Sequence, residues 1–206
     1  MLDLNHVILK GAFASQPREN RTLTQTVLTH AFLKGMQDGR PFYIETTSVD
    51  TTARLVSRFA RPQRLYVVTG TLDSRLDLDP KRTRVRLTTL HETGRGPGEW
   101  VTHGQYEYPD GAQAYAMLSG TAQHDSTPSG SAAHPWRTVI ESVLTTGRHP
   151  FQILTAAPLG QGQHVTTHGT LRTHQHDVWL ECQFAVPDFN PFADSAPPAL
   201  EGTSLQ

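Results

Sequence analysis

The feature that most constrains the fold of this chain is an internal repeat. The stretches GRPFYIET around Phe42 and GRHPFQIL around Phe151 share the pattern Pro-Phe-x-Ile. In both halves, a glycine inside a β-prone run lies 31 positions before this phenylalanine, at Gly11 and at Gly120. Matching features at equal spacing indicate that one structural unit occurs twice.

The next matching feature shows where the two copies differ. A Gly-Thr-Leu triplet begins at Gly70, 28 positions after Phe42, and again at Gly169, 18 positions after Phe151. In the interval that is ten residues shorter, the second copy has the Gly-containing stretch PLGQGQ. We therefore expect a helix in the first copy and a short link at the same place in the second.

The first copy supplies a candidate for that helix. After Asp50, the segment TTARLVSRFARPQ places Leu55, Val56 and Phe59 at helical spacing with arginines between them. It is the only segment of the sequence that clearly predicts a helix. The β-prone runs before it are NHVILKGAF, TLTQTVLTHAF and FYIETTSV, and those after it are RLYVVTGTL and TRVRLTTL. The predicted order is three strands, a helix and two strands.

The second copy again contains five β-prone runs. They read AYAMLSGTA, SAAHPWRTVIESVL, PFQILTAA, QHVTTHGTL and DVWLECQFAV, and the Gly/Pro-rich stretch ETGRGPGEW separates them from the first copy. We therefore predict a first domain over 1–91, a connector over 92–112, a second domain without a helix over 113–188, and a flexible tail over 189–206.

Abundant Thr and dispersed Val agree with an all-β protein. Three strands, a helix and two more strands is the element order of the OB-fold, a five-stranded Greek-key barrel. The predicted fold is therefore two tandem OB modules, the first with a helix between its third and fourth strands.

Cysteine content and apolar runs constrain the compartment. Cys182 is the only cysteine, so it forms no internal disulfide, and its strand-like setting predicts a buried thiol. The start MLDLNHVILKG has no basic region followed by a long apolar core, and no apolar run approaches the ~20 residues of a membrane span. We expect a soluble protein of the cytoplasm, associated with the nucleoid and not with a membrane.

Charge is distributed unevenly between the two copies. Residues 1–86 hold fourteen Lys and Arg against eight Asp and Glu, whereas residues 87–206 hold four against eleven. A polyanion would therefore be attracted mainly to the first half.

The first copy resembles the bacterial single-stranded-DNA-binding (SSB) family. LNHVILKG, from Leu4 to Gly11, is similar to the opening strand of that family, and TTARLVSRFARPQRLYVVTGTLDSR, from Thr51 to Arg75, is similar to its helix and following strand. GTLRTH, which starts at Gly169, repeats the end of that pattern. Two copies in one chain resemble the SSB proteins of the Deinococcus–Thermus lineage.

This resemblance implies sequence-tolerant binding of single-stranded DNA by a homodimer that supplies four OB modules, with no cofactor and no catalytic group. It also implies repair or replication proteins as partners. The family ends in an acidic tail with a terminal Pro-Phe, whereas this chain carries DFNPFADS and continues to EGTSLQ. The usual terminal Pro-Phe tail is therefore absent.

Candidate stacking residues lie around the repeated Pro-Phe. Because residues in a strand alternate between faces, Phe42 and Tyr43 point to opposite sides. Phe42 matches Phe151 and fits a barrel core, although the family places bulky aromatics on this strand, so both residues are candidates for binding single-stranded DNA. Phe32 is a third candidate, with a core position as its alternative. Trp136 is a fourth, as a base platform or as a core residue.

Candidate phosphate-binding residues come mostly from the basic first half. Arg75, Arg84 and Arg86 follow the family-like Gly-Thr-Leu triplet, and Lys10 and Arg64 come next. The remaining candidate is Arg137, beside Trp136.

Other functions are less well supported by the residue pattern. His168, His174 and His176 have no Cys or carboxylate at a recognised ligand spacing, so we predict no metal site. No nucleophile elbow or other ordered catalytic motif is present, so we predict no enzyme. The alternative to DNA binding is an OB-fold protein-interaction or replication-accessory module that binds DNA weakly or not at all.

Overall fold

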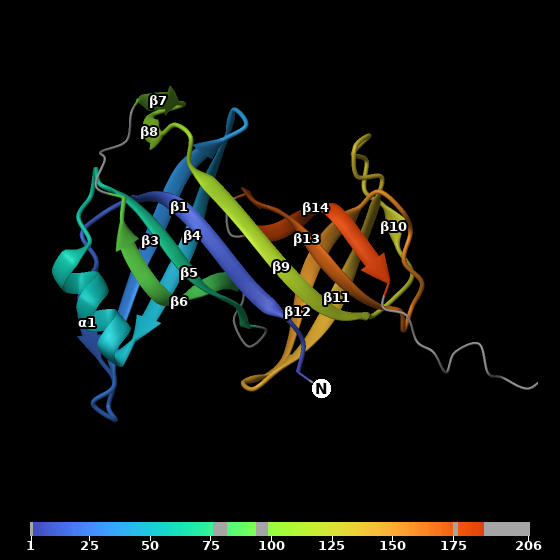
Figure 1. Ribbon diagram of the computed structural model, residues 1–206, viewed down its shortest axis with the longest axis horizontal. Coiled ribbons are helices and arrows are strands. Elements are labelled where there is room, and N and C mark those ends of the chain that lie inside the picture. Colours follow the sequence, from blue (N-terminus) through green and yellow to red (C-terminus); the bar gives the residue numbers. More distant parts are fainter. Residues whose placement is uncertain (1, 76–81, 94–98, 175–176, 188–206) are drawn as a thin grey trace, which may run out of the picture.

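The first half of the chain forms a closed five-stranded barrel (Figure 1). A computed structural model describes residues 2–75, 82–93, 99–174 and 177–187, without the side chains of residues 75 and 82. The barrel strands are β1 (Asn5–Phe13), β3 (Val27–Gln37), β4 (Arg40–Val49), β5 (Leu65–Arg75) and β6 (Arg82–Glu92). They close in the order β1, β3, β4, β6, β5 and back to β1, with β4 and β6 parallel and the other pairs antiparallel. A short strand, β2 (Arg18–Arg21), extends the sheet beside β3.

The second half repeats this topology. Its barrel strands are β9 (Gln113–Ala122), β11 (Trp136–Leu144), β12 (Gly147–Thr155), β13 (His164–His174) and β14 (Asp177–Pro187), and β10 (Thr127–Pro128) lies beside β11. They close in the equivalent order, with β12 and β14 as the parallel pair. The prediction of two tandem OB modules is confirmed.

The helix α1 (Asp50–Phe59) lies between β4 and β5 and has ten residues, which is the length missing from the second copy. Among the described residues, no helix joins β12 to β13, and none anywhere is long and apolar enough to cross a membrane. The helix expected after Asp50 is present, but only one of the three apolar residues that indicated it, Val56, is buried. Ala53 and Val56 are buried, whereas Leu55 and Phe59 are about half exposed. The buried stripe uses small side chains because α1 packs closely on β3 and β4.

The repeated glycines lie where strands approach too closely for a side chain. A Cβ atom on Gly70 would overlap the carbonyl oxygen of Arg86, and one on Gly169 would overlap that of Glu181. Both glycines follow a register shift in the strand pair that closes the barrel, between β5 and β6 and between β13 and β14. The Gly-Thr-Leu triplets that helped to identify the repeat in the sequence therefore mark equivalent strand irregularities in the two barrels.

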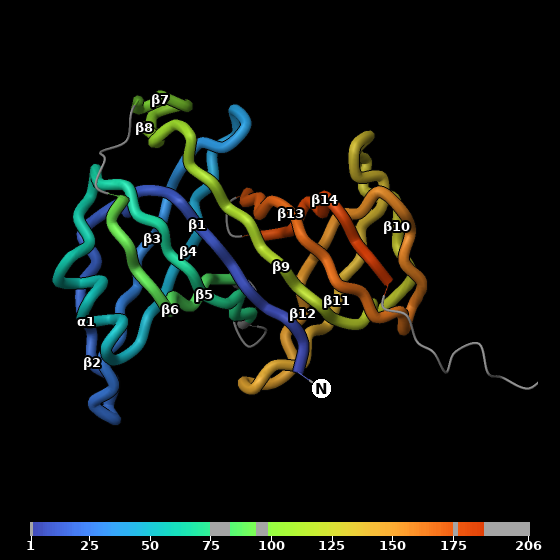
Figure 2. The backbone as a smooth tube through the Cα atoms, in the orientation of Figure 1, coloured from blue at the N-terminus to red at the C-terminus, as the bar shows by residue number. Residues whose placement is uncertain are grey.

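The two barrels share one continuous sheet. β1 and β9 run side by side and antiparallel across the middle of the molecule (Figure 2). Val7 pairs with Ala116. These two residues hold equivalent positions in the two copies, because they are 109 positions apart, as Phe42 and Phe151 are. The strands β6, β5, β1, β9, β13 and β14 therefore form a six-stranded region related by a local pseudo-twofold axis.

The segment predicted as a connector contains regular structure. A two-stranded hairpin, β7 (Trp100–His103) and β8 (Tyr106–Pro109), lies there, and β9 begins at Gln113. The predicted domain limits stay predictions, and the predicted tail, 189–206, lies outside the described residues.

Candidate nucleic-acid interface

Two aromatic side chains stack on the outer surface of the first barrel. Phe32 on β3 and Tyr43 on β4 have ring centroids 4.6 Å apart and ring planes 17° apart. They are diagonal neighbours, because Tyr43 pairs with Lys34 and Phe32 pairs with Glu45. The two residues are 36% and 41% exposed, so the stacked pair, called here the aromatic shelf, is open to a ligand.

Phe42 does not belong to this shelf. Its side chain is 2% exposed and lies with Ile44 in the barrel core, as Phe151 and Ile153 do in the second barrel. Strand alternation, which places Tyr43 outside, necessarily places Phe42 inside. Its prediction as a DNA-binding residue was therefore wrong, and its alternative as a core residue is confirmed.

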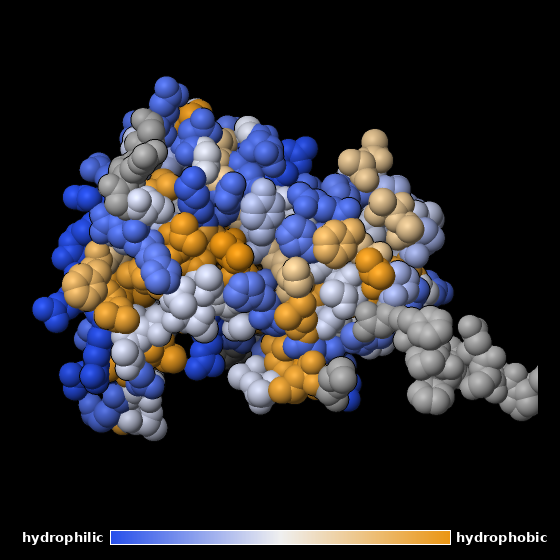
Figure 3. All heavy atoms as spheres, in the orientation of Figure 1, coloured by the Kyte–Doolittle hydropathy of each residue, from blue (hydrophilic) through white to orange (hydrophobic). Residues whose placement is uncertain are grey.

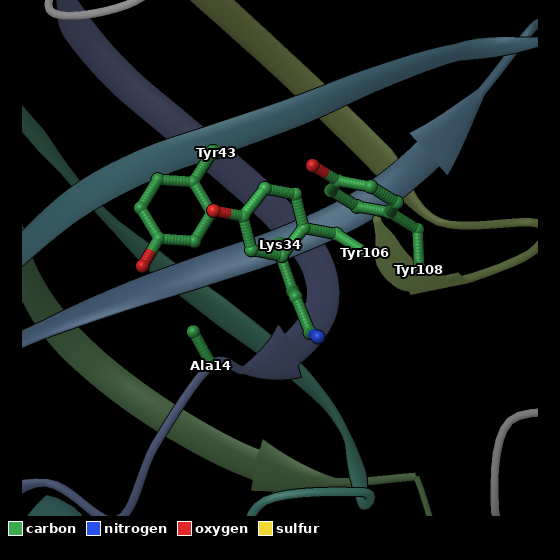
Figure 4. A pocket seen from close by; sticks show the side chains of 5 residues that line it. All are labelled: Ala14, Lys34, Tyr43, Tyr106 and Tyr108. Carbon is green, nitrogen blue, oxygen red and sulfur yellow. The ribbon is translucent and has the colours of Figure 1, made fainter. Parts of the chain in front are cut away.

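More aromatic residues reach the shelf from the β7–β8 hairpin. Tyr43, Tyr106, Tyr108, Lys34 and Ala14 line a pocket of about 390 Å³ (Figure 4). The Lys34 ammonium lies 5.4 Å from the centre of the Trp100 ring and 5.7 Å from that of Tyr108. The shelf thus continues into a pocket with one cation and three tyrosine rings.

Burial raises the pKa of two phenols of this region, Tyr43 and Tyr108. Desolvation raises the pKa of Tyr43 above its usual value, and the neighbouring Tyr108 and Tyr106 raise it further. Desolvation and the nearby Tyr106 likewise raise the pKa of Tyr108. At neutral pH these rings are uncharged, so they can meet a phosphate backbone without repelling it.

The basic candidates of β6 have different environments. Arg84 donates from Nε and Nη2 to Oδ2 of Asp73, at 3.0 and 2.8 Å, and is largely covered. His149 of the second barrel lies beside the same carboxylate, with Nδ1 3.8 Å from Oδ1. Arg84 is therefore paired at the junction of the barrels, and its phosphate role stays a prediction. Arg86 is exposed, and Thr47 of β4 is its partner in register.

The other basic candidates are dispersed. Lys10 lies on β1 between Val67 of β5 and Gln113 of β9, on the six-stranded region instead of on the shelf. Arg64 forms an exposed ion pair with Glu92 at 2.8 Å. The side chain of Arg75 lies outside the described residues.

The second barrel lacks an equivalent aromatic shelf. In the registers of β11 and β12, Gln152 replaces Tyr43 and pairs with Val139, and Arg137 stands where the first barrel has Phe32. Arg137 is exposed, whereas Trp136 is half-buried and alternates onto the side of the buried Thr138. Trp136 and Arg137 therefore point to opposite sides of β11, and the binding role of each stays a prediction.

The second barrel instead supports the strands that carry the shelf. The backbone N–H of Tyr43 donates to Oγ1 of Thr173 on β13 at 3.1 Å. Arg172 donates from Nε to Glu181 at 2.8 Å and from Nη2 to Asp38 in the turn between β3 and β4 at 3.5 Å. These contacts hold the end of the β3–β4 pair against β13 and β14.

Sequence reasoning missed four residues of this region: Lys34, Trp100, Tyr106 and Tyr108. Three of them lie in the segment interpreted as a connector. The available signal was the aromatic alternation in EWVTHGQYEYPDG on both sides of a Gly-containing turn, a pattern typical of a hairpin.

The two described histidines of the three considered as metal ligands have different surroundings. His168 stacks on Phe184 and Tyr115, with centroids 5.3 and 6.0 Å apart, and His174 is exposed at the end of β13. His176 lies outside the described residues. Within the described ranges, no group of three or more His, Cys, Asp or Glu side chains is placed to bind a metal ion.

Solved structures similar to this chain share its fold. Wild-type single-stranded DNA binding protein from Thermus aquaticus matches with a TM-score of 0.69 and 16% identity, over 92% of this chain and 95% of that chain. A deletion mutant of the Thermus aquaticus protein matches with a TM-score of 0.70 and 17% identity, over 92% of this chain and 98% of that chain. No family model and no curated protein sequence matches. The resemblance predicted from the sequence is thus confirmed at the level of the fold.

Proposed function

We propose that this chain binds single-stranded DNA without strong sequence preference, mainly through its first barrel. The observation that carries the proposal is the exposed stack of Phe32 on Tyr43. It lies on the second and third barrel strands, the surface with which OB-folds commonly bind oligonucleotides. Every base has a face that can stack on an aromatic ring, so such a surface tolerates any sequence.

The asymmetry of the two barrels supports placing the main site on the first. The excess of Lys and Arg lies in residues 1–86, and the second barrel has Gln152 where the first has Tyr43. The second barrel then acts chiefly as a support for β3 and β4. The Thermus aquaticus proteins are named for single-stranded DNA binding, which agrees with this assignment.

In the cell, such binding would coat and protect single strands exposed during replication, recombination or repair. The mechanism requires no chemical step, because stacking and phosphate contacts suffice to hold a strand. The alternative is an OB-fold protein-interaction or accessory module, favoured by the second barrel, whose outer strands lack the aromatic shelf.

The test is a titration of the full chain with a long oligo-dT and with duplex DNA at several salt concentrations. We expect tighter binding to the single strand and a log K that falls linearly with log salt. Equal or weaker binding to the single strand in low salt would refute the proposal. Failure to bind either DNA would favour the interaction module.

We also propose that two copies of the chain associate through the outer face of the six-stranded region. Ile8, Met117, Phe184 and Val186 are 38–55% exposed on this face. Figure 3 shows hydrophobic side chains gathered over β1 and β5. Because a pseudo-twofold axis relates the two halves of the face, it can pack on a second copy of itself.

The oligomer test uses light scattering on the purified chain. We expect a mass of twice 22.8 kDa, and a return to 22.8 kDa when Ile8→Asp and Met117→Asp are combined. Leu55→Asp is the matched control, because Leu55 is similarly exposed, at 45%, but lies on α1. A wild-type chain that stays at 22.8 kDa at micromolar concentrations would contradict the dimer.

A further inference from the structure

We propose that the β7–β8 hairpin forms, with β3 and β4, a pocket for one nucleotide of the bound strand. In this pocket, Tyr43 and Tyr106 contact the base, and Lys34 contacts the adjoining phosphate. The inference rests on the proposed function, since it assigns a nucleotide subsite beside the aromatic shelf. It adds a part of the chain that lies outside both barrels.

The size and lining of the pocket fit a nucleotide. Its volume of about 390 Å³ lies within the range of small-molecule sites, roughly 300–1,000 Å³. Tyr106 is 58% exposed and extends from β8 toward Tyr43 (Figure 4). A base entering here can therefore meet an aromatic ring from the barrel and another from the hairpin.

The charge of the pocket favours an anion. Lys34 is its one cation, and no carboxylate is among the residues that line it. Within the described part of the chain, Lys34 has no acidic partner, and its ammonium rests on the faces of Trp100 and Tyr108. Glu107 lines the adjoining hollow that Trp100 faces, so a phosphate is expected on the tyrosine side.

The hairpin is anchored to the barrel at its base. Ala112 is buried against Gly35 of β3, at a point where a side chain on Gly35 would collide with it. The backbone N–H of Ala114 donates to the Gln37 side-chain oxygen at 2.8 Å. The tyrosines of β8 are thus held over β3 before any ligand arrives, which reduces the ordering cost of binding.

The pocket occurs once per chain in the described structure. Val139 and Gln152 stand in the second barrel at the positions of Lys34 and Tyr43. Duplication of the barrel therefore did not duplicate the subsite, and the hairpin gives the first barrel a property of its own.

Trp100 provides a local reporter for the test. In a full-length chain carrying Trp136→Phe and Trp179→Phe, Trp100 is the only tryptophan. Titration with oligo-dT should change its fluorescence, because a phosphate drawing Lys34 away alters the surroundings of the indole. Tyr106→Ala should weaken binding at least about fivefold, the lower end for a lost base stack. Tyr106→Phe, which keeps the ring, should lose less affinity than Tyr106→Ala.

Salt dependence tests the phosphate contact separately. Lys34→Met should reduce the slope of log K against log salt by about 0.7, the value for one phosphate of a single strand. Arg58→Met is the matched control, because Arg58 also lies over an aromatic ring, Phe59 at 5.3 Å, but on α1. This control should leave the slope unchanged.

The outcomes separate the pocket from the general function. If oligo-dT binds without changing the fluorescence of Trp100, and Tyr106→Ala binds like the wild type, the nucleotide pocket is refuted and single-stranded DNA binding stands. An unchanged salt slope for Lys34→Met would refute the phosphate contact. If no oligo-dT binds even in low salt, both proposals fail.

Discussion

Phe42 and Tyr43 are neighbours in sequence with opposite environments, so replacing each by alanine should have opposite effects. Phe42 is 2% exposed in the barrel core, and its removal should cost about 3–5 kcal/mol of unfolding free energy through lost burial and a cavity. Tyr43 is 41% exposed, and its stack on Phe32 is worth only about 0.5–1.5 kcal/mol to the folded state.

Binding should show the reverse order. Loss of one base stack costs about 1–3 kcal/mol, so Tyr43→Ala should weaken the affinity for oligo-dT by about 5- to 150-fold. Gln152→Ala is the matched control at the equivalent site of the second barrel and should bind nearly as well as the wild type.

The assay pairs urea unfolding with a fluorescence titration of each variant. If Tyr43→Ala kept full affinity, or lost no more than Gln152→Ala, the assignment of the shelf as a DNA surface would be wrong. A Phe42→Ala protein as stable as the wild type would contradict the core assignment. Folded protein at the titration temperature should be verified first by circular dichroism.

Three further predictions concern stability and reactivity. Gly70→Ala should destabilise the chain by roughly 1–3 kcal/mol, because its Cβ would overlap a carbonyl of β6. Gly160→Ala should be nearly neutral in thermal melts, because its Cβ would meet only the Asp125 carboxylate at an ordinary contact distance of 3.9 Å. Cys182 should resist thiol reagents until the protein unfolds, since burial raises its pKa to about 12; rapid labelling of the native state would count against this. Desolvation would raise the pKa of Asp3, but hydrogen bonds from the Val143 backbone N–H and from His164 outweigh it, so the pKa is lowered. Asp3→Asn should therefore lower the free energy of unfolding by about 1–2 kcal/mol at pH 7. The stability difference between wild type and variant should shrink below about pH 3.8, because wild-type Asp3 is then protonated. A difference that does not change with pH would exclude an ionic origin.

Much of the fold could be predicted because both copies need the same residue types at the same backbone positions. Gly70 and Gly169 are required where two strands come close, and Phe42 and Phe151 fill equivalent cores. Such local requirements leave regular spacing in the sequence. Apolar spacing indicated α1 through Leu55 and not through Ala53, whereas close packing on the barrel buries the smaller residue.

The binding surface could be predicted only where strand alternation decides it. Alternation placed Tyr43 outside once Phe42 was taken as core, and the structure agrees. It could not determine that Arg84 would be held by Asp73, because that pairing depends on the register of β5 and β6.

The sequence by itself determined the duplicated barrel, the helix present in one copy only, and the side of the strand on which Tyr43 lies. These follow from local spacing, side-chain alternation and backbone sterics, which act over a few residues. Only the tertiary structure decided that Phe32 stacks on Tyr43 and that the β7–β8 hairpin brings Tyr106 to Lys34, some seventy positions earlier in the chain. Contacts of that kind depend on how distant strands pair and pack, and no periodicity along the chain specifies them.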